Sequence, residues 1–256
     1  SCELSGLLNS IQYRMGNVAM EIFVLSIGAS FVQRTTGFGF GIFIMTMLPT
    51  IMSSHGEATT LSGILALTTS LFIVIRKYRF IVWRRLLPIL STFIIVSIGA
   101  IFVLKRMEYG ILNILLGITL IVVSIYFMFF SKRIKVKTTL PVQFTAGTLS
   151  GLMGGFFGMQ GPPAVLYFVS SESDKDHYLA MTQTYFLVGN LMMTMARAYN
   201  GFFTTAVSMG YVYGIAGVVI GNMFGAWVFR HITGTLLKYI IYTYIGISGI
   251  AFLFGS

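Results

Sequence analysis

The sequence predicts an all-α integral membrane protein made of two repeats, each an interrupted, glycine-rich helical segment followed by three transmembrane helices. Three observations support this prediction. Hydrophobic residues make up 56% of the 256 residues and charged residues only 9%, a balance that ordinary soluble domains do not have. Apolar runs close to the ~20 residues that a helix needs to cross a bilayer recur along the chain. Two further apolar stretches are each broken by a glycine-rich motif.

The apolar stretches define ten predicted helical segments. They cover residues 18–34, 41–52, 57–75, 87–104, 110–130, 141–154, 162–170, 178–196, 205–228 and 234–254. Six are long enough to cross a bilayer, and the other four form two interrupted pairs. Each pair either crosses the membrane, which gives eight spans, or folds back as a re-entrant hairpin of half-helices, which gives six. We favour re-entrant hairpins, because each pair is long for a single helix.

The interruptions are two glycine-rich breaks. The first break, residues 36–41, reads TGFGFG, and the second break, residues 154–163, reads GGFFGMQGPP. A shift of 121 positions lays Gly37 on Gly158, and three spans follow each break, so we predict an internal repeat. Matched, interrupted segments in two halves point to a midplane binding site in secondary transporters.

The repeat divides the chain into four parts. They are an N-terminal segment (residues 1–17), a first transmembrane repeat (18–130), a basic linker (131–140) and a second transmembrane repeat (141–256).

The net charge of +10 comes from short basic clusters between apolar runs. This pattern indicates membrane topology and argues against a nucleic-acid partner. The two richest clusters lie in loops 76–85 and 131–140, so we expect both loops to be cytoplasmic and the chain to lie in the cytoplasmic (inner) membrane, in contact with lipid. Arg76 and Arg197 close equivalent spans, and we interpret both as anchors at the membrane surface. The sequence does not indicate whether the protein is a monomer or an oligomer.

The breaks predict an anion site. A break at membrane depth frees backbone groups, which must face protein or water because they are costly to leave unpaired in hydrocarbon. If half-helices begin just after the breaks, their N-terminal amides and positive dipole ends converge on one spot. Gly37, Gly39, Gly41, Gly158 and Gly161 would let a ligand approach the backbone closely. The alternative is that these glycines serve only tight helix packing.

Polar side chains complete the predicted site. Arg34 is the predicted fixed positive charge, although snorkelling to the membrane surface or an ion pair with Glu21 is the alternative. The predicted hydrogen-bond donors to the anion are Gln33, Thr35, Thr36, Gln160 and Asn190. For Asn190, a hydrogen bond between helices is an equal alternative.

Catalytic chemistry finds no support in the sequence. There is no HExxH, Walker or nucleophile-elbow motif, and His55, His177 and His231 all lie in predicted loops. The single cysteine, Cys2, excludes a CxxC metal or redox site. We therefore expect no enzyme activity, no cofactor and no metal site.

The residues around both breaks resemble the sulfite exporter TauE/SafE family of membrane transporters. The similarity lies in residues 32–41, in the tryptophan, basic, leucine, proline segment at 83–88, and above all in residues 151–167, followed by 185–190. It covers about residues 20–254. Arg34 and Gln160 depart from the family pattern, because a small residue and a glycine are usual there.

The resemblance implies transport of sulfite, an organosulfonate such as sulfoacetate, or a related small anion. Together with the paired breaks, it predicts a secondary transporter that exports its substrate by alternating access around a midplane anion site. An anion channel and a non-catalytic membrane subunit of an enzyme complex are the alternatives.

Overall fold

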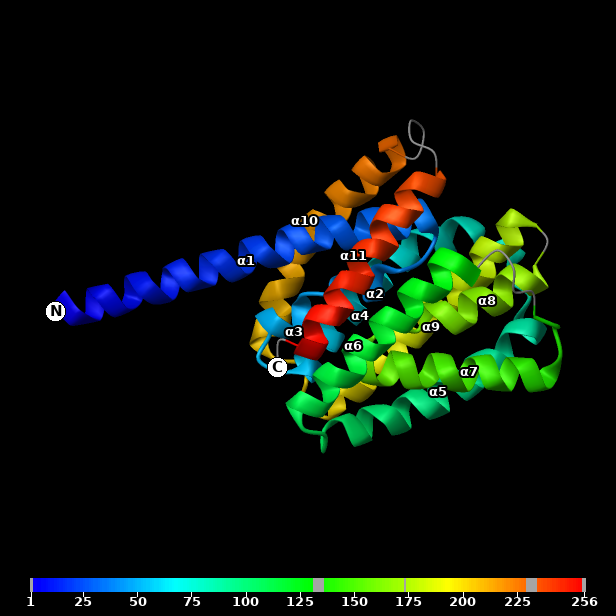
Figure 1. Cartoon of the computed structure of the whole chain (residues 1–256), viewed down its shortest axis with the longest axis horizontal. Coiled ribbons are helices and arrows are strands. Elements are labelled where there is room, and N and C mark those ends of the chain that lie inside the picture. The colour runs from blue at the N-terminus through cyan, green and yellow to red at the C-terminus, as the bar shows by residue number, and fades with distance from the viewer. Residues whose placement is uncertain (1, 131–135, 173, 229–233, 255–256) are drawn as a thin grey trace.

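A computed structural model describes residues 2–130, 136–172, 174–228 and 234–254, and the regular secondary structure in these ranges is helical throughout (Figure 1). The elements are α1 (Cys2–Thr36), α2 (Phe40–Ile44), α3 (Leu48–Ile51), α4 (His55–Lys77), the 3-10 helix η1 (Tyr78–Phe80), α5 (Trp83–Leu104), α6 (Tyr109–Ile125), the π-turn η2 (Tyr126–Phe130), α7 (Leu140–Phe157), α8 (Gly161–Ser171), α9 (Lys175–Tyr199), α10 (Thr205–Val228) and α11 (Gly234–Phe254). The prediction of an all-helical protein is confirmed.

Five helical stretches among the described residues are long and apolar enough to cross a membrane, so the chain is a multi-pass membrane protein. They are Gly16–Thr36, His55–Phe80, Trp83–Leu104, Tyr109–Phe130 and Thr205–Val228. We expected α9 among them, but the mean hydropathy of its 25 residues is too low for it to count as a membrane span. The reason is its polar content, which includes Gln183, Asn190 and Arg197. In α11, the apolar part that qualifies is the shorter stretch Tyr242–Phe254.

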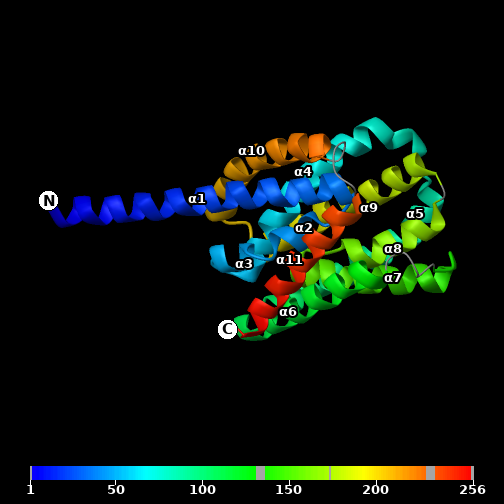
Figure 2. The ribbon, with the colours of Figure 1, turned by 45° about the horizontal axis from the view of Figure 1, so that its top comes forward.

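The first interrupted segment differs from the predicted pair of half-helices. Residues 18–34 belong to the continuous 35-residue helix α1, whose N-terminal part extends away from the bundle (Figures 1 and 2). Residues 17–36 contain one glycine and no proline, so nothing interrupts the helix there. After the first break, the chain forms two short helices, α2 and α3. The second interrupted segment does consist of two helices, α7 and α8.

The helices pack in four main pairs: α1 on α10, α5 on α7, α4 on α9 and α6 on α11 (Figure 2). Glycines allow the backbones to approach closely, as is common between membrane helices. A Cβ on Gly221 of α10 would overlap the backbone of Ile27 in α1. Between α6 and α11, a Cβ on Gly117 or on Gly249 would lie 2.7 or 2.8 Å from the other residue's carbonyl oxygen.

Polar contacts collect at two opposite ends of the bundle. At one end, which we call the basic end, the loop after α4 meets the segment between α8 and α9. Here Lys77 Nζ lies 2.7 Å from Asp176 Oδ1, and Arg85 Nη1 lies 3.5 Å from Glu172 Oε2. The backbone amide of Val136, in the linker, donates to Ser170 Oγ at the same end.

At the other end, the start of α4 meets the starts of α6 and α10. Thr204 Oγ1 donates to Glu57 Oε1 over 2.6 Å, and Tyr109 Oη donates to the carbonyl oxygen of Pro49 over 2.8 Å. His55 was expected in a loop, but it is the first residue of α4. It is buried, and its Nε2 lies 2.9 Å from Asn113 Oδ1. His231 lies outside the described residues.

The contact of α1 with α10 gives a testable prediction. Gly221→Ala should lower the free energy of unfolding by about 1–3 kcal/mol, because the added methyl overlaps the backbone of Ile27, which has no rotamer that relieves the clash. The thermal unfolding midpoint of the purified protein in detergent measures this.

Gly99→Ala in α5 is the matched control, because a Cβ at Gly99 meets no atom within 4 Å. Alanine there should be neutral or stabilising by up to about 1 kcal/mol through its helix propensity. Equal midpoints for the two variants would contradict the packing described above.

Candidate binding site at the two helix breaks

The structure brings the two breaks into contact. A Cβ on Gly41, in the first turn of α2, would overlap the carbonyl oxygen of Gly158, which ends α7. The breaks come from residues more than a hundred positions apart, so this contact joins the two halves of the chain. A small, partly open cavity lies between the two breaks.

Each break turns the chain with glycines in the left-handed region of φ. Gly37 and Gly39 have φ of 84° and 99° and direct the chain from the end of α1 into α2. Gly158 has φ of 69° and caps α7, and its amide donates to the carbonyl oxygen of Gly154 over 2.8 Å. Proline stands at Pro162 and Pro163, in the first turn of α8, where an amide hydrogen would have no partner inside the helix.

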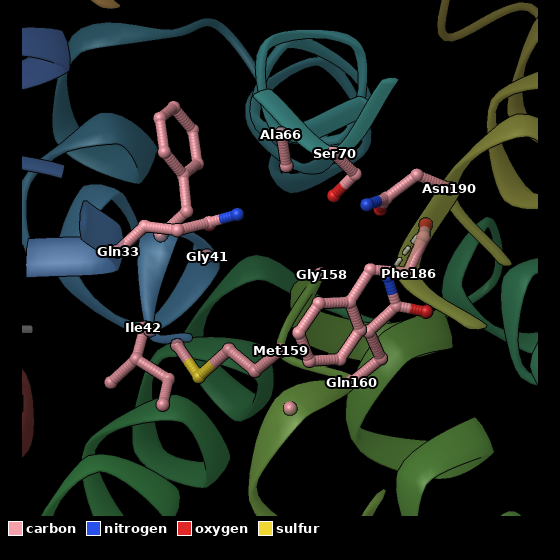
Figure 3. A pocket seen from close by; sticks show the side chains of 13 residues that line it. Gln33, Gly41, Ile42, Ala66, Ser70, Gly158, Met159, Gln160, Phe186 and Asn190 are labelled. Atoms are coloured by element: carbon pink, nitrogen blue, oxygen red, sulfur yellow. Dashed lines mark hydrogen bonds between the residues drawn. The ribbon is translucent and has the colours of Figure 1, made fainter. Parts of the chain in front are cut away.

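The cavity lies where α1, α2, α4, α8 and α9 meet (Figure 3). Its lining residues are Gln33, Gly39, Phe40, Gly41, Ile42, Ala66, Ser70, Gly158, Met159, Gln160, Gly161, Phe186 and Asn190. The cavity has a volume of about 30 Å³. A single water needs about 10–15 Å³ by this measure, so the space suits two waters or one small ion.

Most polar side chains around the cavity are bonded to other protein groups. Gln33 Nε2 donates to Thr69 Oγ1 over 3.0 Å, and Ser70 Oγ donates to Gln183 Oε1 over 3.0 Å. Gln160 Nε2 donates to the carbonyl oxygen of Phe186 over 3.3 Å. These bonds fix the lining in place.

Two side chains are exceptions. The Oε1 atom of Gln160 is buried without a hydrogen-bond partner among the described residues, and the second exception is Asn190. Its side chain is only 3% exposed, yet its amide makes no hydrogen bond to any described residue. Figure 3 shows the Asn190 amide turned toward Ser70 at the edge of the cavity. A buried amide normally has a partner, so the cavity is where its partner must come from.

Seven of the eleven residues predicted for the site line this cavity: Gln33, Gly39, Gly41, Gly158, Gln160, Gly161 and Asn190. The other four are Arg34, Thr35, Thr36 and Gly37, and they do not line it. The hydroxyls of Thr35 and Thr36 donate to carbonyl oxygens of α1, at Phe31 and Val32. The carbonyl oxygen of Gly37 accepts from Gln183 Nε2 over 3.1 Å.

Arg34 lies on another face of α1 from the one we expected. It is exposed, and its Cβ and Cγ pack near Gly225 of α10. The neighbouring Gln33 faces the cavity instead, because successive residues on a helix point about 100° apart. The predicted fixed positive charge is therefore not beside the breaks.

The positive charge near the breaks is Arg197, and our interpretation of it as a surface anchor is wrong. Arg197 is 0% exposed. Its Nη2 donates to the carbonyl oxygens of Gly154 and Gly155 over 2.7 and 3.3 Å, and its Nη1 donates to that of Thr59 over 3.1 Å. The sequence held a signal for this, because Arg197 lies two helical turns after Asn190 and thus on the same face of α9. Arg76, its counterpart, is exposed as expected.

Comparison with known proteins gives two matches. Residues 22–252 match the family described as sulfite exporter TauE/SafE. A protein of Cupriavidus necator described as a probable sulfite/organosulfonate exporter TauE is 21% identical over 201 residues, which are 77% of this chain and 78% of that protein. No solved structure matches the chain.

The contact between the breaks gives a second prediction. Gly41→Ala should destabilise the protein by about 1–3 kcal/mol, because the methyl overlaps a backbone carbonyl oxygen that the cap at Gly158 holds in place. Gly161→Ala is the control, because its nearest atom would lie 3.5 Å away, an ordinary contact. We expect that variant to stay within about 0.5 kcal/mol of the wild type. Thermal unfolding midpoints test both, and a neutral Gly41→Ala would mean that the breaks are farther apart.

Proposed function

The chain belongs to the sulfite exporter TauE/SafE family, and we propose that it is a secondary transporter that exports a small sulfur-containing anion across the cytoplasmic membrane. The anion is sulfite or a small organosulfonate, and it binds in the cavity between the two breaks. Transport proceeds by alternating access around this cavity.

The unpaired amide of Asn190 carries the proposal. It lines the cavity, is almost fully buried, and has no hydrogen-bond partner among the described residues. Its Nδ2 is a donor that an oxyanion oxygen would satisfy. Gly41 and Gly161 also line the cavity, and each lies in a first helical turn, where backbone amides have no partner inside the helix. Residues that carry hydrogen-bond donors therefore line this small space from three elements, beside one unpaired acceptor, Gln160 Oε1.

The size of the cavity supports a compact substrate. With a volume of about 30 Å³, it suits an ion with a single central atom better than one with a carbon chain. So small a cavity also supports a carrier with a single binding site over a channel with a continuous wet pore. The flux of labelled sulfite would distinguish the two. In a carrier, this flux saturates with sulfite concentration and is accelerated by an opposing gradient of unlabelled sulfite.

The element bounds support a duplicated architecture. When α4 (His55–Lys77) is shifted by 121 positions, its ends fall within one residue of those of α9 (Lys175–Tyr199). The same shift moves the end of α1, Thr36, onto Phe157, the end of α7. The packing agrees, because α1 rests on α10 and α7 rests on α5, which is the same pairing with the halves exchanged.

The contacts of α4 with α9 support an inverted relation between the repeats. Ser70 bonds Gln183, and Lys77 bonds Asp176, so residue numbers fall along α9 as they rise along α4. The two helices are equivalent under the shift yet run in opposite directions. Repeats related in this way have opposite orientations in the membrane.

The contacts at the ends of the bundle support re-entrant hairpins. The α7–α8 segment enters from the linker at Val136 and leaves toward α9 at Ser170, and these two residues are hydrogen-bonded to each other. Both of its ends are therefore at the basic end. For the first hairpin, Val18 of α1 and Ile51 of α3 line one surface groove, so this segment also returns to the end where it began.

The basic loop 76–85 would place the basic end in the cytoplasm. The linker 131–140 was the second part of that prediction, and its residues 131–135 lie outside the described part of the chain. The N-terminal segment 1–17 and the division into repeats at 18–130 and 141–256 are part of the same proposal.

Asn190→Leu tests the proposed site. Because Asn190 bonds no described protein group, leucine of similar size should leave the unfolding midpoint unchanged or higher. Sulfite binding should weaken roughly 10- to 100-fold, because one hydrogen bond to a charged ligand is lost. Stabilisation of the purified protein by sulfite in a thermal-shift titration measures both quantities.

Asn113→Leu is the matched control. Asn113 is bonded to His55 far from the cavity, so this variant should lose stability and keep its sulfite affinity. If Asn190→Leu also lost stability, or bound sulfite as the wild type does, Asn190 would have a structural partner and the site would be wrong.

Single cysteines test the hairpins. In a Cys2→Ser background, Arg79→Cys and Asp174→Cys should be labelled by an impermeant maleimide from the same side of the membrane, and Ser53→Cys from the other side. All three positions are exposed. Labelling of Arg79→Cys and Asp174→Cys from opposite sides would mean that the α7–α8 segment crosses the membrane.

A further inference from the structure

Arg197 carries a buried charge that no acidic side chain balances. The described residues form two ion pairs, Lys77 with Asp176 and Arg85 with Glu172, and neither involves Arg197. Its hydrogen-bond acceptors are three neutral carbonyl oxygens. A buried charge without a counter-charge is costly, and in membrane proteins it commonly faces a ligand or an ion path.

The charge lies next to the cavity. The side chain of Arg197 runs back along α9 past Met193, whose Sδ is 3.8 Å from Nη2. A Cβ on Gly63 would lie 3.4 Å from Arg197 Nη1 and 3.7 Å from Asn190 Oδ1, so the guanidinium and the unpaired amide are neighbours. Arg197 also holds the last turn of α7, whose cap Gly158 lines the cavity.

The helix dipoles at the second break largely offset each other. The C-terminus of α7 carries about half a negative charge and the N-terminus of α8 about half a positive one, and they are separated only by residues 158–160. The net fixed charge beside the cavity is therefore that of the Arg197 guanidinium, one positive unit.

Other charged groups on the elements packed against α9 are engaged elsewhere or lie far along the helix. On α4, Glu57 is buried, accepts from Thr204 through Oε1, and forms no ion pair, and its Oε2 has no partner among the described residues. His55 bonds Asn113, while Arg76 and Lys77 are at the basic end. On α5, Arg84 and Arg85 begin the helix at the basic end, and Arg79 in η1 is exposed there. No residue of α7 or α8 is acidic or basic. On α9 itself, Asp176 and His177 are at the opposite end from Arg197.

We propose that Arg197 sets the charge of the transported species, so that the site takes a monovalent oxyanion: hydrogensulfite or a sulfonate rather than the dianions sulfite and sulfate. This inference rests on the proposed function. One negative charge neutralises the guanidinium, whereas a second negative charge would have no counter-charge among the described residues that line the cavity. Arg197 acts here as a positioning residue, because its Nη1 and Nη2 are occupied by the carbonyl oxygens of Thr59, Gly154 and Gly155, while its Nε has no partner among the described residues. It acts on the ligand through its electric field and through the second break.

The wild-type protein in detergent provides the first test, with thermal shift or calorimetry as the readout. Sulfite is titrated at pH values below and above its second ionisation, which lies near neutral pH. Only the monoanion should bind, so the apparent Kd for total sulfite should rise about tenfold for each pH unit above that ionisation. Methanesulfonate, which is a monoanion at every pH used, should keep a constant Kd, and sulfate should bind at least about tenfold more weakly than methanesulfonate.

The outcomes separate this inference from the proposed function. Two results together would support both the proposed function and the monoanion inference. Asn190→Leu weakens the binding of methanesulfonate or of sulfite at low pH, and sulfite binding follows the pH profile above. Sulfite binding that is constant or tighter at high pH, or sulfate binding as tight as methanesulfonate, would overturn the monoanion inference and leave the proposed function in place. Binding of none of these anions at any pH would overturn both.

Variants of Arg197 give the second test. Arg197→Gln removes the charge, so monoanion affinity should fall at least about tenfold. Arg197→Lys keeps the charge and should restore a large part of that affinity and the same pH profile. Arg76→Gln, at the equivalent exposed position of α4, should bind as the wild type does. If lysine restores folding but not monoanion preference, the role of Arg197 is structural and the inference fails.

Discussion

The contact between Gly41 and the carbonyl oxygen of Gly158 is the constraint on which the rest of the structure depends. It requires a residue without a Cβ at the start of α2, and it requires the chain to turn sharply at both breaks, which the positive φ values of Gly37, Gly39 and Gly158 provide. Because the breaks meet, helix ends whose amides and carbonyls would otherwise face lipid instead face each other and one shared cavity.

The chemistry around that cavity divides between two residues of α9. Asn190 offers an unpaired amide to a ligand in the cavity. Arg197 does not line the cavity, but it donates to carbonyl oxygens in the last turn of α7 and adds a positive charge next to the cavity. This division keeps the charge out of direct hydrogen bonding with a ligand. In the proposed site, a ligand held by amides and attracted by a nearby charge would bind without a direct ion pair and could therefore be released again.

The packing also limits how the protein can move. The α1–α10 and α5–α7 contacts each join a helix of the first half to a helix of the second half. The two halves of the sequence therefore do not form two separate rigid bodies. The moving bodies in the proposed alternating access are therefore mixed, one around α1 with α10 and the other around α5 with α7. The α4–α9 pair takes one helix from each half and contacts both bodies, α10 through α4 and α5 through α9. It carries Asn190 and Arg197, so it is suited to follow both bodies.

The sequence by itself determined the membrane class, the all-helical fold and the two glycine-rich breaks, because apolar run length and glycine clusters are local properties of the chain. Of the eleven residues that the sequence predicted for the site, seven line the cavity. Only the tertiary structure decided which arginine lies beside the breaks. Arg34 is adjacent to the first break in sequence but lies on the wrong face of α1, whereas Arg197 is distant in sequence and is buried there because α4 and α7 pack around α9. Burial of a charge depends on its neighbours in space. Those neighbours come from other helices, and the sequence pattern does not show which helices pack against each other.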